Sequence, residues 1–116
     1  MKTINLIIGI LLLSVSGLFA QTAKTDSITV QGNCGMCKNR IEKAAKSVDG
    51  VTSAEWNKET KMLELTYDES KTNIHKVHMA ISLVGHDTDM LKAKDKVYNN
   101  LPGCCKYDRP KAKQKN

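Results

Sequence analysis

Alternation of apolar and polar residues marks three short segments of the chain as strands. Residues 27–31 alternate, with Ile28 and Val30 at the apolar positions, which is the pattern of a strand with one buried face. Residues 51–56 and 62–67 are two further strand candidates, and the polar residues between them are typical of a turn. We therefore predict one strand followed, later in the chain, by a hairpin.

Two other segments repeat apolar residues every three or four positions, the spacing of one face of a helix. The first lies after Met36 and has these apolar positions: Ile41, Ala44, Ala45 and Val48. The second ends before Gly85 and has these: Ile74, Val77, Ile81 and Val84. Glycine directly after the last apolar position is a common signal of a helix end. The predicted order is strand, helix, strand, strand, helix.

A fourth strand would have to lie at residues 86–92, where Thr88, Met90 and Leu91 are its only support. With it, the order becomes β-α-β-β-α-β, the ferredoxin-like arrangement. We predict an α+β fold, a ferredoxin-like sandwich in which a four-stranded antiparallel sheet has both helices on one face. The predicted domain covers residues 27–92.

The first residues of the chain have the features of an export signal. Lys2 is followed by an almost wholly apolar run over residues 4–19, and Ala20 stands at a position suited to cleavage. The run is too short and its flanks are wrong for a membrane span. We predict a signal peptide at 1–20, a polar linker at 21–26, and a periplasmic or secreted protein with no stable membrane insertion after cleavage.

Most of the formal charge of +6 lies at the C-terminal end, where the last 11 residues carry +4. Residues 21–105 hold 12 basic and 11 acidic side chains and are nearly neutral. A basic tail can bind nucleic acid or anionic lipid, but Tyr107 is the one aromatic residue in it. We predict a C-terminal extension, residues 93–116, that is unstructured from Lys111 and binds no nucleic acid.

The four cysteines form two close pairs, Cys34/Cys37 and Cys104/Cys105, unlike the dispersed cysteines that cross-link small exported proteins. Cys34 and Cys37 fall where the first predicted strand meets the first predicted helix. Backbone N–H groups and the helix dipole stabilise a thiolate at a helix start. Such a pair can be a soft-metal site, a redox-active disulfide or an inert local disulfide, and the spacing alone does not decide among them.

Three short motifs stand at the ends of the predicted elements: Cys34-x-x-Cys37, Asp49-Gly50-Val51 and Gly85-His86-Asp87. Together they resemble the heavy-metal-associated domain family of copper chaperones, P-type metal ATPases and the periplasmic mercury-binding protein. The resemblance covers residues 27–92. It implies a ferredoxin-like fold, a soft metal ion held between Cys34 and Cys37, and transfer of that ion to a metal-transporting membrane protein or another thiol-rich protein.

The chain departs from the family pattern around the metal loop. Most members carry a methionine shortly before the cysteine pair, whereas this chain has Asn33 directly before Cys34 and has Met36 between the cysteines. The Met36 thioether could bind metal, although a methionine in such a loop more often only covers it. His86 stands where many bacterial members have tyrosine. Because a histidine in this loop is a metal ligand in some relatives, His86 is a candidate ligand.

Cys104 and Cys105 have no counterpart in the family domain. Adjacent cysteines cannot both face one metal ion without an unusual backbone, so the alternatives are one added ligand, a strained disulfide between neighbours, or pairing with another chain. A free basic tail has no need for a Pro-Gly turn and paired cysteines. We therefore expect the extension to fold back and bring Cys104 or Cys105 near Cys34 and His86.

The donor set favours Cu(I), which is satisfied by two or three thiolates, over Zn(II), which generally takes four ligands. Hg(II) is a chemically similar alternative. We predict an exported Cu(I) chaperone or scavenger that is not an enzyme and that exchanges ligands through its Cys-x-x-Cys loop; the alternatives are a mercury-binding protein and a thiol-disulfide oxidoreductase. The oxidoreductase is disfavoured because Pro102 and Pro110, the only prolines, lie in the extension rather than opposite the cysteine pair.

Overall fold

The computed structural model describes residues 23–109, and three strands in this range form one antiparallel sheet. The strands are β1 (Ala23–Thr29), β2 (Val51–Trp56) and β3 (Met62–Asp68). β3 lies in the middle and pairs with both neighbours, in the order β1-β3-β2. The two strands of the predicted hairpin are therefore confirmed.

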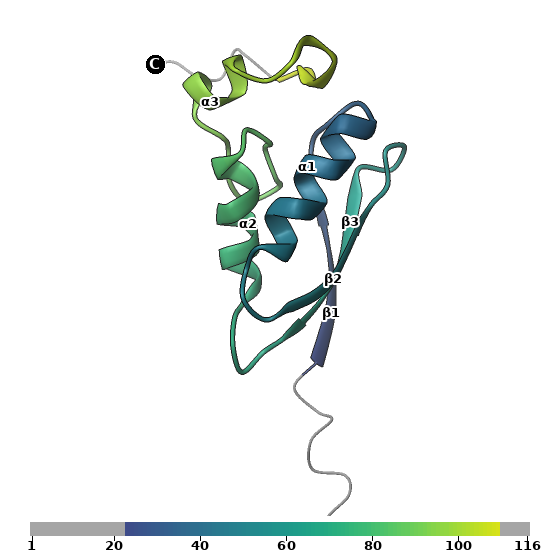
Figure 1. Ribbon diagram of the computed structural model, residues 1–116, viewed down its shortest axis with the longest axis vertical. Helices are drawn as coiled ribbons and strands as arrows, with labels where there is room; N and C mark the ends of the chain where they lie inside the picture. The colour runs from purple at the N-terminus through teal and green to yellow at the C-terminus, as the bar shows by residue number, and fades with distance from the viewer. Residues whose placement is uncertain (1–22, 110–116) are drawn as a thin grey trace, which may run out of the picture.

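Two helices cover one face of this sheet (Figure 1). They are α1 (Gly35–Lys46) and α2 (Ile74–Leu83), and each buries the apolar face that its spacing predicts. The core between helices and sheet includes these buried residues: Ile28, Val30, Ile41, Ala45, Trp56, Leu63, Leu65, Val77 and Ile81. Burying a large apolar side chain contributes roughly 1.5–3 kcal/mol, so this layer fixes the helices on the sheet.

β1 begins at Ala23 rather than at Ser27, so most of the predicted linker belongs to the strand. Its first residues pair with the end of β3, where the Tyr67 hydroxyl donates a hydrogen bond of 2.7 Å to a carboxylate oxygen of Asp26. The side chains of this part of β1 are mostly exposed on both faces. A strand without a buried face shows no alternation, and for that reason the sequence pattern missed it.

The sheet has three strands in residues 23–109, not the four that we predicted. A single bridge between Val30 and Thr88 stands in place of the fourth strand at residues 86–92. The Thr88 hydroxyl accepts hydrogen bonds from the backbone N–H groups of Met90 and Leu91, at 3.1 and 3.0 Å. These local bonds turn the chain away from β1 directly after the bridge. The α+β class and the two helices on one face agree with the prediction.

α2 ends in a glycine turn. Gly85 has a φ of +107°, its N–H donates to the carbonyl of Ser82, and the N–H of His86 donates to the carbonyl of Ile81, which is a Schellman motif. A Cβ atom at Gly85 would also lie 3.0 Å from Cδ2 of Leu101. Glycine is therefore required here both by the backbone angle and by the packing of a later segment.

Residues 93–109, called the extension below, fold back over the end of the domain where α1 begins (Figure 1). The extension contains a short helix, α3 (Asp95–Asn99), and a 3-10 turn, η3 (Gly103–Cys105), neither of which the sequence predicted. Its buried residues Leu101, Cys105 and Tyr107 belong to the core cluster. The expected return of this segment to the domain is confirmed.

Within residues 23–109, no helix has the length and apolar character needed to cross a membrane. The predicted signal peptide at 1–20, its cleavage near Ala20 and the tail from Lys111 lie outside the described residues. They stay predictions.

Candidate metal centre

The first cysteine pair lies where the loop after β1 becomes α1. Cys34 is the cap residue before the helix, in an extended conformation and with no side-chain capping hydrogen bond. Cys37 is fully buried in the first turn, and its sulfur accepts a hydrogen bond of 3.3 Å from the backbone N–H of Asn33. The two Sγ atoms are 3.5 Å apart. The helix start thus holds one partly exposed and one buried sulfur side by side.

The extension brings the second cysteine pair to the same place. Sγ of Cys104 lies 3.3 Å and Sγ of Cys105 lies 3.4 Å from Sγ of Cys34. We expected Cys104 or Cys105 to approach Cys34, and the 3-10 turn η3 brings both sulfurs to it. All four cysteines are free thiols, so no disulfide joins either pair. Three sulfurs therefore surround that of Cys34, and we call the four residues the thiol cluster.

The two thiols at the helix start differ in acidity. Burial raises the pKa of Cys34, but a hydrogen bond from the backbone N–H of Cys37 and hydrogen bonds with the surrounding thiols outweigh it and lower the pKa from 9.0 to about 6. Burial raises the pKa of Cys37 to about 11. At neutral pH the cluster therefore holds a thiolate at Cys34 beside a protonated Cys37.

The thiols of the extension are less acidic than an ordinary cysteine. The hydrogen bond with Cys34 raises the pKa of Cys104, and burial raises the pKa of Cys105. Nη1 of Arg40 donates a hydrogen bond of 3.2 Å to Sγ of Cys105. A guanidinium at this distance offsets the negative charge that grows when several thiols ionise to bind a metal. Lys38 instead pairs with Glu42 of the same helix.

Three sulfurs of the cluster are arranged to share one ion. The Sγ atoms of Cys34, Cys104 and Cys105 all lie within 4.8 Å of one another. Soft sulfur donors in twos or threes suit Cu(I). The cluster can present the helix pair Cys34 and Cys37, or the three-sulfur set that includes the extension. Cys34 belongs to both sets.

His86 is fully buried and lies outside this three-sulfur set, as far as the described residues show. Its Nδ1 is 2.7 Å from the carbonyl oxygen of Gln31, and its ring stacks on Tyr107 with centroids 5.5 Å apart. Burial lowers the pKa of His86, so the ring is neutral at pH 7 and Nδ1 donates to the carbonyl. Nε2 then carries a lone pair, and it has no partner among residues 23–109.

A polar anchor holds the extension beside the Gly85 turn. The Tyr107 hydroxyl donates to the carbonyl of Gly85 at 2.7 Å and accepts from the backbone N–H of Asp87 at 2.9 Å. Arg109 donates to both carboxylate oxygens of Asp87, at 2.8 and 3.0 Å, the bidentate geometry of a strong ion pair. We call Tyr107, Arg109 and Asp87 the anchor.

Sequence reasoning missed the roles of all three anchor residues. Arg109 is one of several basic residues near the C-terminus, and Asp87 stood out only as part of a family motif. The available signal was the pair of tyrosines on either side of the Pro-Gly turn. Tyr98 and Tyr107 pack edge to face with ring centroids 4.9 Å apart, and aromatic residues at both ends of a short segment favour a folded segment over a solvated one.

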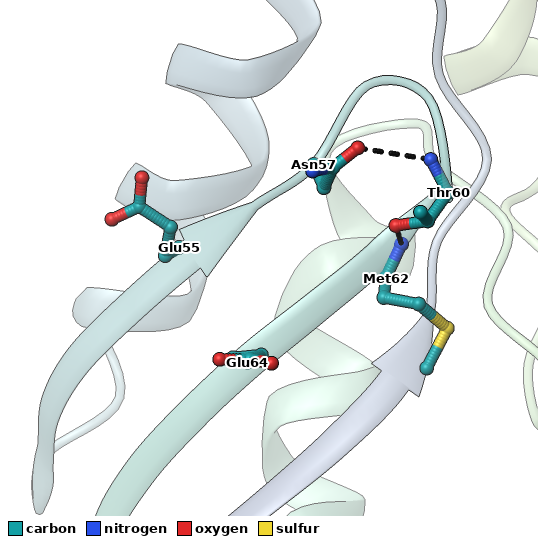
Figure 2. Close-up of a pocket in the computed structure, with 5 residues that line it drawn as sticks. All are labelled: Glu55, Asn57, Thr60, Met62 and Glu64. Carbon is teal, nitrogen blue, oxygen red and sulfur yellow. Dashed lines mark hydrogen bonds between the residues drawn. The ribbon is translucent and has the colours of Figure 1, made fainter.

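Figure 2 shows a hollow on the outer face of the β2-β3 hairpin. It is lined by Glu55, Asn57, Thr60, Met62 and Glu64. The side-chain oxygen of Asn57 accepts a hydrogen bond of 2.9 Å from the backbone N–H of Thr60, so it serves the turn. Glu55 and Glu64 are cross-strand partners. This hollow is a feature of the turn and of the open sheet face, separate from the thiol cluster.

The fold is a three-stranded antiparallel sheet with two helices on one face, and cysteines gather at the start of the first helix. These features define a small metal-binding α+β domain. Residues 27–87 match the heavy-metal-associated domain family. The chain belongs to this family, which confirms the predicted resemblance. The match ends at Asp87, so the extension and its two cysteines lie outside it.

The relatives of this chain include copper proteins. The copper chaperone CopZ of Staphylococcus aureus (strain bovine RF122 / ET3-1) is 41% identical over 61 residues, which are 52% of this chain and 90% of the chaperone. The water-soluble region of the P-type ATPase CopA from Bacillus subtilis is similar with a TM-score of 0.53 and 31% identity, over 57% of this chain and 44% of that region.

A third relative is oxidized MerP from Ralstonia metallidurans CH34, with a TM-score of 0.50 and 26% identity over 57% of this chain and 96% of MerP. Of these three relatives, CopZ is named as a copper chaperone. This similarity agrees with the prediction that the chain is not an enzyme.

Proposed function

We propose that this protein is an exported Cu(I)-binding protein that acts as a copper chaperone or scavenger and favours retention of the ion over rapid delivery. The observation that carries the proposal is the approach of three sulfurs to that of Cys34, at 3.3, 3.4 and 3.5 Å. The family and its copper chaperone relatives support copper as the metal.

Retention follows from the number of sulfurs. A two-thiolate site on an open loop leaves a position for a partner's sulfur, and the ion then moves by ligand exchange. In this protein Cys104 and Cys105 occupy the space next to Cys34. A partner must displace them before it can take the ion. We therefore expect slower handover and tighter holding than in a domain without the extension.

The number of sulfurs favours Cu(I) over Zn(II). A structural Zn(II) site generally takes four ligands in a tetrahedron, whereas two or three thiolates satisfy Cu(I). Three sulfurs that lie within 4.8 Å of one another match a three-coordinate Cu(I) ion. Hg(II) binds thiolates equally readily and is the alternative that the experiment must separate.

The partner we propose is a metal-transporting membrane protein or another thiol-rich protein. The support is that CopA, a P-type ATPase, has a soluble region similar to this domain.

The proposed export rests on the apolar run at residues 4–19. N-terminal sequencing of the protein recovered from expressing bacteria tests it: we expect a start at Gln21 outside the cytoplasm, and intact Met1 on cytoplasmic protein would contradict export.

The main test is anaerobic titration of the reduced protein with Cu(I), Zn(II) and Hg(II), each against a competing chelator. X-ray absorption on the loaded protein then gives the number of sulfur ligands. We expect Cu(I) to be bound most selectively, with three sulfurs around one ion. Stronger selection of Hg(II) would favour the mercury-binding alternative, and a four-sulfur Zn(II) complex of higher selectivity would contradict the copper assignment.

The double variant Cys104→Ser/Cys105→Ser tests the contribution of the extension. We expect its Cu(I) complex to have two sulfurs and an affinity lower by at least about 10- to 100-fold, the loss that follows even when only a residue supporting a ligand is changed. Met79→Leu is the matched control because it removes a sulfur from an exposed position on α2. If the double variant keeps both the affinity and the sulfur number, the extension is not part of the site and fast delivery becomes the better description.

A further inference from the structure

A fifth sulfur lies on the solvent side of the thiol cluster. Met36 is 50% exposed although it is a large apolar residue. Its Sδ accepts a hydrogen bond of 3.6 Å from the thiol of Cys104, which is exposed as well. Cys104 in turn lies 3.3 Å from Cys34. The three sulfurs form a continuous path from solvent to the centre of the cluster.

Packing does not explain the position of Met36. The side chain contributes to none of the buried core, which α1 builds from its opposite face. Within residues 23–109, two other methionines are comparably exposed, Met79 at 45% and Met90 at 59%, and the hydrogen bonds between sulfur atoms in this range involve neither of them. Met36 is thus the exposed methionine that stands next to the proposed metal ligands.

We propose that Met36 Sδ and Cys104 Sγ form an outer site through which Cu(I) enters and leaves the thiol cluster. The inference rests on the proposed Cu(I) function and adds a transfer site to it. A thioether is a soft, neutral donor that binds Cu(I) and has little affinity for Zn(II) or other harder ions. Such a donor suits an ion in transit because it carries no charge that would hold the ion.

The transfer needs no redox partner, because copper stays Cu(I) throughout. A bond from copper to the carrier's donor breaks as the lone pair of Met36 Sδ forms a new one, and no proton leaves since a thioether has none. Cys104 then binds as a thiolate and gives its proton to solvent. The bond to Met36 breaks when the Cys34 thiolate takes its place, and release runs through the same steps in reverse.

The surroundings of Met36 define the carriers that fit. Met36 lines a shallow hollow together with Asn39, Arg40 and Lys43 of α1. The two cationic side chains favour an anionic carrier of Cu(I), such as a small thiolate complex or an anionic chelate. Bicinchoninate, which forms an anionic Cu(I) complex, is therefore the carrier chosen for the test.

The experiment compares the reduced protein with its Met36→Leu variant, a substitution that keeps volume and apolar character while removing the sulfur. Stopped-flow spectroscopy follows Cu(I) passing from bicinchoninate to the protein and back. We expect loading and release to slow equally, by about fivefold, equivalent to about 1 kcal/mol in the barrier. The equilibrium affinity and the sulfur number from X-ray absorption should stay the same. Met90→Leu is the control and should keep both rates.

The outcomes separate the two proposals. If the unmodified protein does not bind Cu(I), the proposed function and the outer site both fail. If it binds Cu(I) and Met36→Leu exchanges at the unmodified rate, only the outer site fails. If Met36→Leu lowers the affinity and the sulfur number, Met36 is a resident ligand, and that overturns its role in transfer.

Discussion

The domain, residues 27–87, and the extension, residues 93–109, are held in place by different kinds of interaction. In the domain, a continuous buried layer of aliphatic side chains and Trp56 joins the helices to the sheet. The extension adds three buried residues, Leu101, Cys105 and Tyr107, and packs the partly buried Tyr98 against them. Its strongest polar attachment is the anchor.

Because of this difference, the stability of the domain and the number of sulfurs in the thiol cluster depend on different regions of the molecule. A broad apolar layer unfolds cooperatively, whereas a short segment with few buried contacts can open locally at a much lower free energy. The domain should therefore stay folded when the extension detaches. The thiol cluster should not stay intact, because two of its four sulfurs leave with the extension.

The largest effect is expected from Leu65→Ala in the middle of β3. Leu65 is fully buried, so the free energy of unfolding should fall by about 2–5 kcal/mol. Urea unfolding followed by circular dichroism measures it. Glu64→Ala, on the exposed face of the same strand, is the control and should stay within about 0.5 kcal/mol. Equal losses for both variants would contradict the description of the core.

Arg109→Gln should release the extension and leave the domain folded. Asp87 and Arg109 are mostly buried, with side chains 8% and 15% exposed, so we expect a local loss of about 2 kcal/mol, below the 3–5 kcal/mol of a fully buried pair. Hydrogen exchange should accelerate at the Tyr107 amide and not in β3. Lys106→Gln, an exposed neighbour, is the control. Faster exchange throughout the chain would show that the two regions are one cooperative unit.

Tyr107→Phe should weaken the attachment less. The hydroxyl makes hydrogen bonds with the carbonyl of Gly85 and the N–H of Asp87. Loss of these two bonds should lower the free energy of attachment by about 1–2 kcal/mol. The matched control is Tyr67→Phe, which removes a single hydroxyl bond to Asp26 in the domain. The control should keep the Cu(I) sulfur number. Nuclear magnetic resonance of the Cys105 amide reports attachment, and an unchanged resonance in Tyr107→Phe would remove this hydroxyl from the anchor.

The smallest expected effect is a dependence of the attachment of the extension on pH. Burial raises the pKa of Asp87, but hydrogen bonds from Arg109 and from the backbone N–H of Ala93 outweigh it and lower the pKa below its ordinary 3.8. The anchor therefore contributes its full free energy of attachment above about pH 3.8. This contribution is lost as the pH falls through the lowered pKa of Asp87. Amide resonances of the extension should shift below about pH 3.8 before those of β3. Arg109→Gln should lack this selective shift, and simultaneous loss of both regions would contradict it.

The sequence predicted the parts of the molecule that apolar periodicity determines. Both helices, the hairpin and the proximity of Cys34 to Cys37 follow from spacing. Periodicity carries no information where a strand is exposed on both faces, as at the start of β1, or where a side chain ends a strand by local hydrogen bonds, as Thr88 does. These two places account for the differences in the sheet.

The candidate site was predictable only in part, for a similar reason. The return of the extension could be inferred from cysteines that a free tail does not need. The approach of both Cys104 and Cys105 to Cys34 depends on the 3-10 turn η3, which has no repeating pattern. The contact between Arg40 and Cys105 joins residues far apart in the chain, and no local pattern encodes it.

The position of Leu101 over Gly85 bears on how such a site can evolve. The extension begins after the family domain ends, and it attaches to that domain through a residue without a side chain and one carboxylate, Asp87. Ligand number can thus change by adding or removing one segment after the family domain, with no redesign of the core. For protein engineering, another domain of this fold would need a glycine and an aspartate at the positions of Gly85 and Asp87 before residues 93–109 are grafted onto it.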